Sequence, residues 1–137
     1  WFSRKEMRAS VTAQSVLLVD DSAFFRNMLA PVLKAAGYKV RVAVNAQEGL
    51  SALRAQNFNV VLTDIEMPDM NGFEFAETIR ADNNLSQMPI IALSSLVSPA
   101  AIERGRQAGF HDYVAKFDRP GLIAALKEQT ADVQKAA

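Results

Sequence analysis

Carboxylate side chains follow two short apolar runs in this sequence, and their placement would allow them to act together. The run at 16–19 (VLLV) leads into Asp20 and Asp21, and the run at 60–63 (VVLT) leads into Asp64. Clustered carboxylates repel one another, so bringing them together costs free energy unless a cation neutralises them. A hard divalent cation with oxygen ligands meets that need, and we expect Mg²⁺ because it binds a few carboxylates and keeps several waters.

A hydroxyl and an ammonium group end two further runs. Ser94 follows the run at 90–93 (IIAL), and Lys116 ends the run at 112–116 (DYVAK). A divalent cation and an ammonium around one carboxylate make a site for a phosphoryl group, because the carboxylate can attack phosphorus while the cations hold its oxygens. Taken singly, each residue is explained as a helix cap, a turn residue or a solvated charge. Only the residues taken together favour a chemical role.

The elements that must position these residues alternate between strands and helices. The apolar runs are short and mostly lack alternation, as expected of parallel strands whose sheet is covered on both faces. Strand–helix units of this spacing predict an α/β fold in which crossover helices join parallel strands. We expect strands at 16–19, 39–44, 60–63, 90–93 and 112–116, and helices at about 25–36, 46–53, 75–79, 99–108 and 122–132.

The expected sheet determines which residues meet. Open parallel sheets bind ligands outside the carboxyl ends of their strands, at the point where the strand order reverses. In a flavodoxin-like sheet of order 2-1-3-4-5 with five helices, that point lies between the first and third strands, where Asp20, Asp21 and Asp64 would meet. Asp64 is then the expected nucleophile, and Pro68 and Gly72 would shape the loop that follows it.

The composition excludes several other classes of function. The chain has 15 basic and 15 acidic residues, so its net charge favours neither nucleic acid nor an anionic membrane as a partner. It has no cysteine, which excludes disulfides, thiol catalysis and cysteine-held metals. No apolar run approaches the ~18 residues of a membrane span. Residues 1–14 lack a clear period and begin with Trp1 rather than Met, so we interpret them as a linker or the tail of a preceding domain, with one domain over 15–137.

The sequence resembles a response-regulator receiver domain over about residues 15–130. The paired acids, the loop 64–72 (DIEMPDMNG), the hydroxyl after the fourth strand and the lysine after the fifth follow the order and spacing of that family. The resemblance implies that Asp64 receives a phosphoryl group from a histidine of a partner kinase, with Mg²⁺ as the cofactor. It implies that Asp21 is a direct metal ligand, that Asp20 acts largely through water, and that the backbone carbonyl of Glu66 also reaches the metal.

The resemblance assigns roles to three further side chains. Ser94 matches the switch hydroxyl that binds the phosphoryl group, Lys116 matches the ammonium that contacts it, and Tyr113 matches the aromatic switch residue. The helix at 99–108 contains a single large aliphatic residue, Ile102, so it can bury little apolar area and should be weakly docked. We therefore expect this helix, the fifth strand and the last helix to form the surface that changes on phosphorylation.

The details of the sequence are most similar to the C-terminal receiver of hybrid chemotaxis histidine kinases. The stretches at 20–40, 91–99 and 109–122 carry this similarity. It implies a cytoplasmic domain whose partner is a histidine kinase or a histidine phosphotransfer domain, and which is fused to a chemotaxis kinase. The alternative is a free-standing, diffusible single-domain regulator or phosphate sink. No basic recognition helix follows, so nucleic acid is not an expected partner.

Two residues depart from the family pattern. The lysine of the fifth strand is usually followed by a proline in a cis peptide bond, whereas here Phe117 follows Lys116. A non-proline cis bond costs about 2.5–4 kcal/mol, so we predict a trans bond and a redrawn turn, with Asp118 as a nearby helix cap. Leu96, two residues after Ser94, is unusually bulky and apolar for its position. It would hinder the approach of water, which predicts slow self-dephosphorylation.

Other classes of function fit the residues less well. Haloacid-dehalogenase-type phosphatases also use a strand-end aspartate with Mg²⁺, but they need an acid two residues later, and Glu66 would misplace the general acid. A Walker-type nucleotide site is excluded because no glycine-rich phosphate loop with lysine is present. A receiver that binds partners without phosphorylation is disfavoured because the acids and Lys116 are all present. His111, the only histidine, is expected to be a solvated loop residue rather than a phosphorelay or metal residue.

Overall fold

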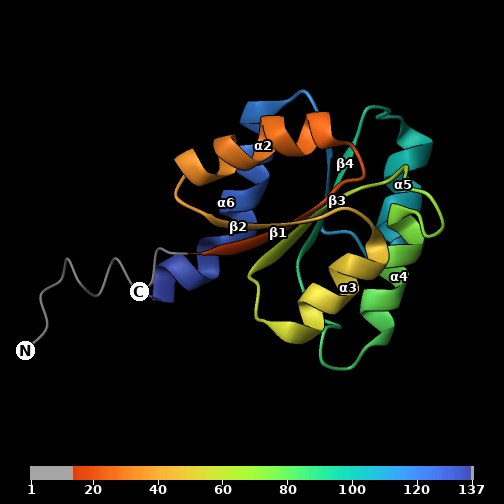
Figure 1. Cartoon of the computed structure of the whole chain (residues 1–137), viewed down its shortest axis with the longest axis horizontal. Coiled ribbons are helices and arrows are strands. Elements are labelled where there is room, and N and C mark those ends of the chain that lie inside the picture. Colours follow the sequence, from red (N-terminus) through yellow and green to blue (C-terminus); the bar gives the residue numbers. More distant parts are fainter. Residues whose placement is uncertain (1–13, 137) are drawn as a thin grey trace, which may run out of the picture.

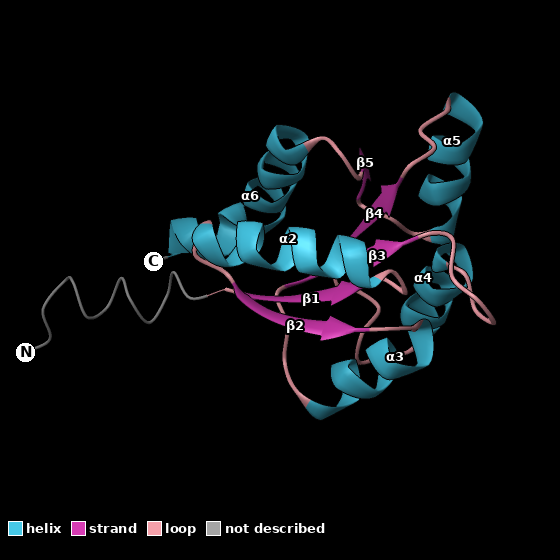
Figure 2. Ribbon diagram, turned by 45° about the horizontal axis from the view of Figure 1, so that its top comes forward, coloured by secondary structure: helices cyan, strands magenta, loops and turns pink. Residues whose placement is uncertain are grey.

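The computed structural model describes residues 14–136, and the side chains of residues 14–130. The expected linker falls almost wholly on residues 1–13, which lie outside the described part of the chain. Five parallel strands form one sheet of order β2-β1-β3-β4-β5, as the sequence predicts (Figure 2). The strands are β1 (Ser15–Val19), β2 (Lys39–Ala43), β3 (Val60–Asp64), β4 (Ile90–Ser94) and β5 (Asp112–Ala115).

Helices cover both faces of the sheet (Figure 1). Two of them, α2 (Ala23–Ala35) and α6 (Arg119–Ala136), lie on one face. The other three, α3 (Ala46–Ala55), α4 (Gly72–Ala81) and α5 (Pro99–Ala108), lie on the opposite face. The expected five helices are confirmed, and none within residues 14–136 is long and apolar enough to cross a membrane.

The hydrophobic core consists of two clusters, one on each face of the sheet. Successive strand residues point to opposite faces, so Val16 and Leu18 of β1 join the cluster under α2 and α6, whereas Leu17 and Val19 join the other. All four side chains are fully buried. The continuous apolar character of the central strands therefore reflects burial on both sides, as expected of a parallel sheet.

The turn after β5 forms without a cis peptide bond, as the sequence predicts. Residues 14–136 contain no cis peptide bond, so the Lys116–Phe117 bond is trans. The Asp118 amide donates to the Ala115 carbonyl at 3.0 Å, and Asp118 Oδ1 accepts from the Gly121 amide at 2.9 Å. This cap starts α6 at Arg119, three residues earlier than the apolar pattern indicates, because that pattern begins only at the first buried residue.

The start of α4 also differs from the sequence interpretation. The expected helix begins at about residue 75, whereas α4 begins at Gly72 with Asn71 as its N-cap. Asn71 Oδ1 accepts from the Glu74 amide at 2.9 Å, and the Glu74 carboxylate accepts from the Asn71 amide at 3.1 Å, which completes a capping box. The helix therefore begins close behind the loop that follows Asp64.

Candidate functional site

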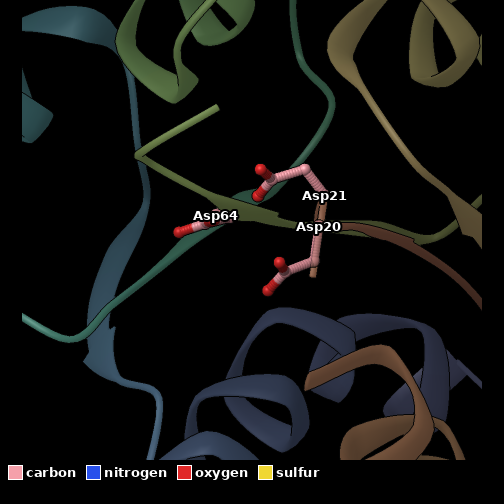
Figure 3. Close-up of side chains that lie close together, drawn as sticks. All are labelled: Asp20, Asp21 and Asp64. Atoms are coloured by element: carbon pink, nitrogen blue, oxygen red, sulfur yellow. The ribbon is translucent and has the colours of Figure 1, made fainter. Parts of the chain in front are cut away.

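Three aspartates meet at the carboxyl edge of the sheet. Asp20 and Asp21 follow β1, Asp64 ends β3, and the two strands are paired neighbours. Each residue offers a carboxylate oxygen, and these oxygens lie within 4.8 Å of one another (Figure 3). Asp20 and Asp64 are buried, whereas Asp21 is exposed. The structure thus brings together the acids that the sequence analysis placed at the switch point.

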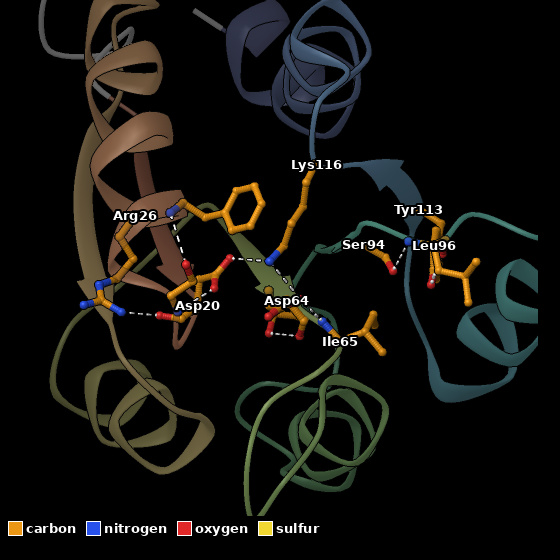
Figure 4. Close-up of polar contacts among 11 residues, drawn as sticks. Asp20, Arg26, Asp64, Ile65, Ser94, Leu96, Tyr113 and Lys116 are labelled. Atoms are coloured by element: carbon orange, nitrogen blue, oxygen red, sulfur yellow. Dashed lines mark hydrogen bonds and ion pairs between the residues drawn. The ribbon is translucent and has the colours of Figure 1, made fainter.

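Lys116 lies between two of these acids (Figure 4). Its Nζ is 3.0 Å from Asp20 Oδ2 and 3.2 Å from Asp64 Oδ1, and its side chain is 6% exposed. The backbone fixes the residue as well, because the Lys116 amide donates to the Ser94 carbonyl at 3.0 Å and so extends the pairing of β5 with β4. A buried ammonium with two carboxylate partners is far more constrained than a solvated lysine, which is the explanation that Lys116 would have if considered singly.

Asp64 has an unusual titration. Burial is the main cause that raises its pKa to about 6, and repulsion from Asp20 raises it further. The Lys116 ammonium and the Ile65 amide, which donates to Asp64 Oδ1 at 2.8 Å, act in the opposite direction without cancelling these effects. A carboxylate in this state gains from a further cation, which would stabilise its charged form.

The two carboxylate oxygens of Asp20 differ in their hydrogen bonding. Its Oδ1 accepts from the Ser22 amide at 2.9 Å. Its Oδ2 is buried and makes no hydrogen bond of good geometry, although it lies within ion-pair distance of Lys116. Together with the exposed carboxylate of Asp21, this donor set fits a hard divalent cation, which prefers oxygen ligands of this kind.

Ser94, Leu96 and Tyr113 are linked by hydrogen bonds. The Leu96 amide donates to Ser94 Oγ at 3.0 Å, and the Tyr113 hydroxyl donates to the Leu96 carbonyl at 3.3 Å (Figure 4). Ser94 is buried at the end of β4, whereas Leu96 is 61% exposed. The backbone of Leu96 therefore connects the hydroxyl expected to bind phosphate with the aromatic residue expected to switch.

The loop from Asp64 to Gly72 passes very close to the end of β3. A Cβ added to Gly72 would collide with the backbone carbonyl of Asp64 and lie 2.8 Å from Ile65 Cα. The Gly72 amide donates to the Ile65 carbonyl at 2.8 Å, so glycine is required for this approach. Asp69 has a positive φ of 70° in a tight turn. Glu66 is exposed in the same loop, and its backbone carbonyl remains a predicted ligand.

His111 is exposed, as expected, but its ring is not free. Its Nδ1 accepts from the Ile90 amide at 3.3 Å and lies 3.1 Å from Arg80 Nη2, so the proton belongs on Nε2. Burial lowers the pKa of His111, and the charge of Arg80 lowers it further. His111 is not part of the acidic cluster.

Sequence analysis did not identify Arg26 as part of the site. Its Nη1 donates to the backbone carbonyl of Asp20 at 2.7 Å and so fixes the segment that carries the paired acids. Arg26 lies one helical turn into α2, on the turn nearest the site. An arginine six residues after a strand-end acid is a weak signal, since most such side chains are solvated.

Comparison with known proteins agrees with this geometry. Residues 16–127 match the family described as response regulator receiver domain. Among curated proteins, the gliding motility regulatory protein of Myxococcus xanthus is 36% identical over 101 residues, which are 74% of this chain but 13% of that protein. The chain thus spans a small part of this relative.

Solved structures with the same fold include two receivers. The chemotaxis response regulator CheY4 of Vibrio cholerae is 33% identical, with a TM-score of 0.80 and coverage of 86% of this chain and 99% of that one. The receiver domain of the sensor histidine kinase PA1611 of Pseudomonas aeruginosa PAO1, solved with a magnesium ion in its active site cleft, is 29% identical, with a TM-score of 0.80 and coverage of 87% and 98%. The chain belongs to the response regulator receiver domain family.

Proposed function

We propose that Asp64 accepts a phosphoryl group from a histidine of a partner kinase or phosphotransfer domain. The position of Asp64 carries this proposal. It is a buried carboxylate at the end of β3, beside Asp20 and Asp21 and 3.2 Å from the Lys116 ammonium. A carboxylate that attacks phosphorus must lie next to a cation and must then carry the anionic phosphoryl group. The charges around Asp64 suit such a nucleophile.

The two carboxylate oxygens of Asp64 would have different roles in the transfer. Oδ1 is engaged by the Ile65 amide and Lys116, so we assign the attack to Oδ2. Oδ2 forms a bond to phosphorus while the bond from phosphorus to the donor's imidazole nitrogen breaks, and the electron pair returns to that nitrogen. Because its pKa is raised only to about 6, Asp64 is mostly ionised at neutral pH and needs no base to activate it.

Lys116 and Ser94 would receive the transferred group. The Lys116 ammonium already faces Asp64 and can turn to a phosphoryl oxygen without leaving its place beside Asp20. The Ser94 hydroxyl accepts one hydrogen bond from the Leu96 amide, and its own proton can be donated to a second phosphoryl oxygen. Both contacts strengthen as negative charge gathers on the oxygens, which is the condition for stabilising the transition state.

Mg²⁺ is the cofactor that the donor set supports. We assign its ligands to the carboxylates of Asp20, Asp21 and Asp64 and the backbone carbonyl of Glu66, with Asp21 as a direct ligand and Asp20 acting largely through water. When bound, the ion would offset the charge of the carboxylates and of the phosphoryl oxygens. The magnesium ion in the cleft of the PA1611 receiver supports this assignment.

The surface formed by α5, β5 and α6 is our candidate for the output of the signal. Helix α5 buries only Gly105 and Ala108, and its Ile102 remains 43% exposed. Beside it lies an open hollow of about 380 Å³. The hollow is lined by Ile102, Arg106, Phe110, His111, Asp112 and Tyr113. Tyr113 therefore connects this surface to the Ser94 end of the site.

We further propose a cytoplasmic, chemotaxis-type system with the receiver fused to a histidine kinase. The likeness to CheY4 supports the first part, and the likeness to a receiver of a sensor histidine kinase supports the second. A diffusible single-domain regulator is the alternative. Phosphotransfer from purified candidate kinases, compared by initial rate, distinguishes the partners.

Stoichiometric labelling tests the proposed function. Incubation with acetyl phosphate and Mg²⁺ should add one phosphoryl group per chain, read by intact-mass spectrometry, and none without the metal. Asp64→Asn should abolish labelling, and Asp21→Ala should weaken it by removing a Mg²⁺ ligand. Labelling that persists in Asp64→Asn contradicts the assignment. Many turnovers of a small phosphate ester would instead favour a phosphatase.

A further inference from the structure

The ammonium of Lys116 has a third neighbour besides its two carboxylates. Its Nζ lies 4.0 Å from the centroid of the Phe25 ring, within the range in which an aromatic face attracts a cation. An ammonium has three N–H groups, and among the described residues only two carboxylates, those of Asp20 and Asp64, lie within ion-pair distance of it. The ring face therefore occupies the remaining side of a cation that is almost fully buried.

The Phe25 ring is itself held by a second aromatic residue. Phe25 lies in the first turn of α2, and Phe117 directly follows Lys116 in the loop before α6. Their ring centroids are 5.4 Å apart at an interplanar angle of 63°, an edge-on arrangement that favours association. Phe117 is 68% exposed, so its ring contributes the contact with Phe25 rather than buried area in the core.

We propose that Phe25 is a positioning residue for Lys116 in the phosphoryl transfer assigned above, and that Phe117 holds the Phe25 ring in place. A ring face attracts the ammonium but accepts no proton, binds no Mg²⁺ and carries no charge. It also excludes water from the side of Nζ that faces away from the carboxylates. Because the ring contact does not involve Asp64, it persists when the phosphoryl group replaces one carboxylate partner. The inference rests on the proposed function.

Simple packing of the lysine stem is the alternative explanation, and substitutions can separate the two. Phe25→Leu fills a similar volume without an aromatic face, whereas Phe25→Tyr retains the face. Phe73→Leu is the matched control, because Phe73 also lies in the first turn of a helix, is half-buried and sits under a cation, Arg104, at 4.7 Å. Arg104 and Phe73 take no part in the proposed site.

Two measurements test the proposal. NMR of the unphosphorylated protein should show ring-current shifts of the Lys116 methylene protons that disappear in Phe25→Leu and remain in Phe25→Tyr. The maximal rate of phosphorylation by acetyl phosphate with Mg²⁺ should fall roughly fivefold in Phe25→Leu, remain near the wild-type rate in Phe25→Tyr and Phe73→Leu, and fall less in Phe117→Ala. Thermal melts confirm that each variant is folded.

The outcomes separate this inference from the proposed function. An unchanged Lys116 shift or an unchanged maximal rate in Phe25→Leu overturns the inference, as does a Phe25→Tyr variant that is as slow as Phe25→Leu. If wild-type protein is not phosphorylated at Asp64, the proposed function fails instead, and loss of the ring-current shift in Phe25→Leu would then show positioning of Lys116 without phosphoryl transfer.

Discussion

The ring of Tyr113 packs so closely against Gly105 that a single added carbon would push the ring by a few tenths of an ångström. A Cβ at Gly105 would lie 3.0 Å from Tyr113 Cδ2 and 3.3 Å from Phe110 Cδ2. The absence of a side chain at Gly105 thus allows the ring to lie where it does, and from that position the Tyr113 hydroxyl reaches the Leu96 carbonyl at 3.3 Å.

Gly105→Ala and Tyr113→Phe should therefore release the same restraint. Tyr113→Phe removes the hydrogen bond to the Leu96 carbonyl, and Gly105→Ala weakens it by pushing the ring. The Leu96 amide should therefore exchange with solvent several-fold faster in both variants, while the free energy of unfolding changes by only about 1 kcal/mol. Hydrogen exchange followed by NMR measures the effect. The double variant should exchange no faster than the single ones. Additive effects would show that the glycine and the hydroxyl act separately.

Asp64 should make the metal-free protein less stable as pH rises. Its folded-state pKa of about 6 lies above its ordinary value of 3.8, so the folded state binds more protons between these values and loses stability as pH rises through them. Asp64→Asn removes this loss and should be more stable at pH 7 by on the order of 2–3 kcal/mol without metal. Urea unfolding from pH 4 to 8 measures it.

The comparison between wild type and Asp64→Asn isolates this effect from His111. The pKa of His111 is lowered in the folded state, so its contribution has the opposite sign and is lost as pH falls below about 6.5. Both proteins contain His111, and its contribution cancels in the difference. Adding Mg²⁺ should narrow the gap, since only wild type retains the full ligand set. A gap that is constant from pH 4 to 8 would contradict the assigned pKa.

Gly72→Ala should disrupt the loop after Asp64. The added methyl group meets the backbone of Asp64 and Ile65, which cannot move as a side chain can, so we expect destabilisation by more than about 2 kcal/mol. Gly49→Ala is the control, because its nearest contact, at 3.0 Å, is the side-chain atom Phe75 Cζ. Urea unfolding of both variants measures the difference. Equal effects would show that this loop tolerates a shift.

Helix α5 should open more readily than α2. The only buried residues of α5 are Gly105 and Ala108, whereas α2 buries Leu29 and Leu33 fully. Less buried apolar area means a smaller free energy of local opening, so the amides of α5 should exchange at least about tenfold faster. Native-state hydrogen exchange reads both helices in one experiment. Equal or stronger protection of α5 would remove the physical basis for proposing this surface as the output.

The sequence predicts much of the fold because strand ends and helix faces are local features. The apolar runs end within one residue of the strand ends, and Asp20, Asp64 and Lys116 meet because parallel strands share one carboxyl edge. Gly37 directly follows the helix expected at about 25–36, and its φ of 99° is the left-handed conformation typical of a glycine that ends a helix.

The remaining contacts depend on geometry between elements that no local pattern encodes. Phe25 begins the helix expected at about 25–36, and nothing in the local pattern indicates that its ring faces the ammonium of Lys116, 91 residues later in the chain. The reach of Arg26 to the Asp20 carbonyl and the use of His111 Nδ1 as an acceptor depend likewise on where helices pack. Asn71 and Glu74 have the spacing of a capping box, but an Asn-Gly pair also marks turns, so the local pattern alone does not distinguish the two.

Mapping the phosphorylated residue tests the central claim most directly. The protein is phosphorylated with acetyl phosphate and Mg²⁺, and borohydride then reduces the acyl phosphate of an aspartate to homoserine, which tandem mass spectrometry locates. We predict homoserine at position 64 alone, and none when Mg²⁺ is withheld. Homoserine at position 20 or 21, or a phosphoryl group on His111 or a hydroxyl side chain with position 64 unmodified, would contradict the account.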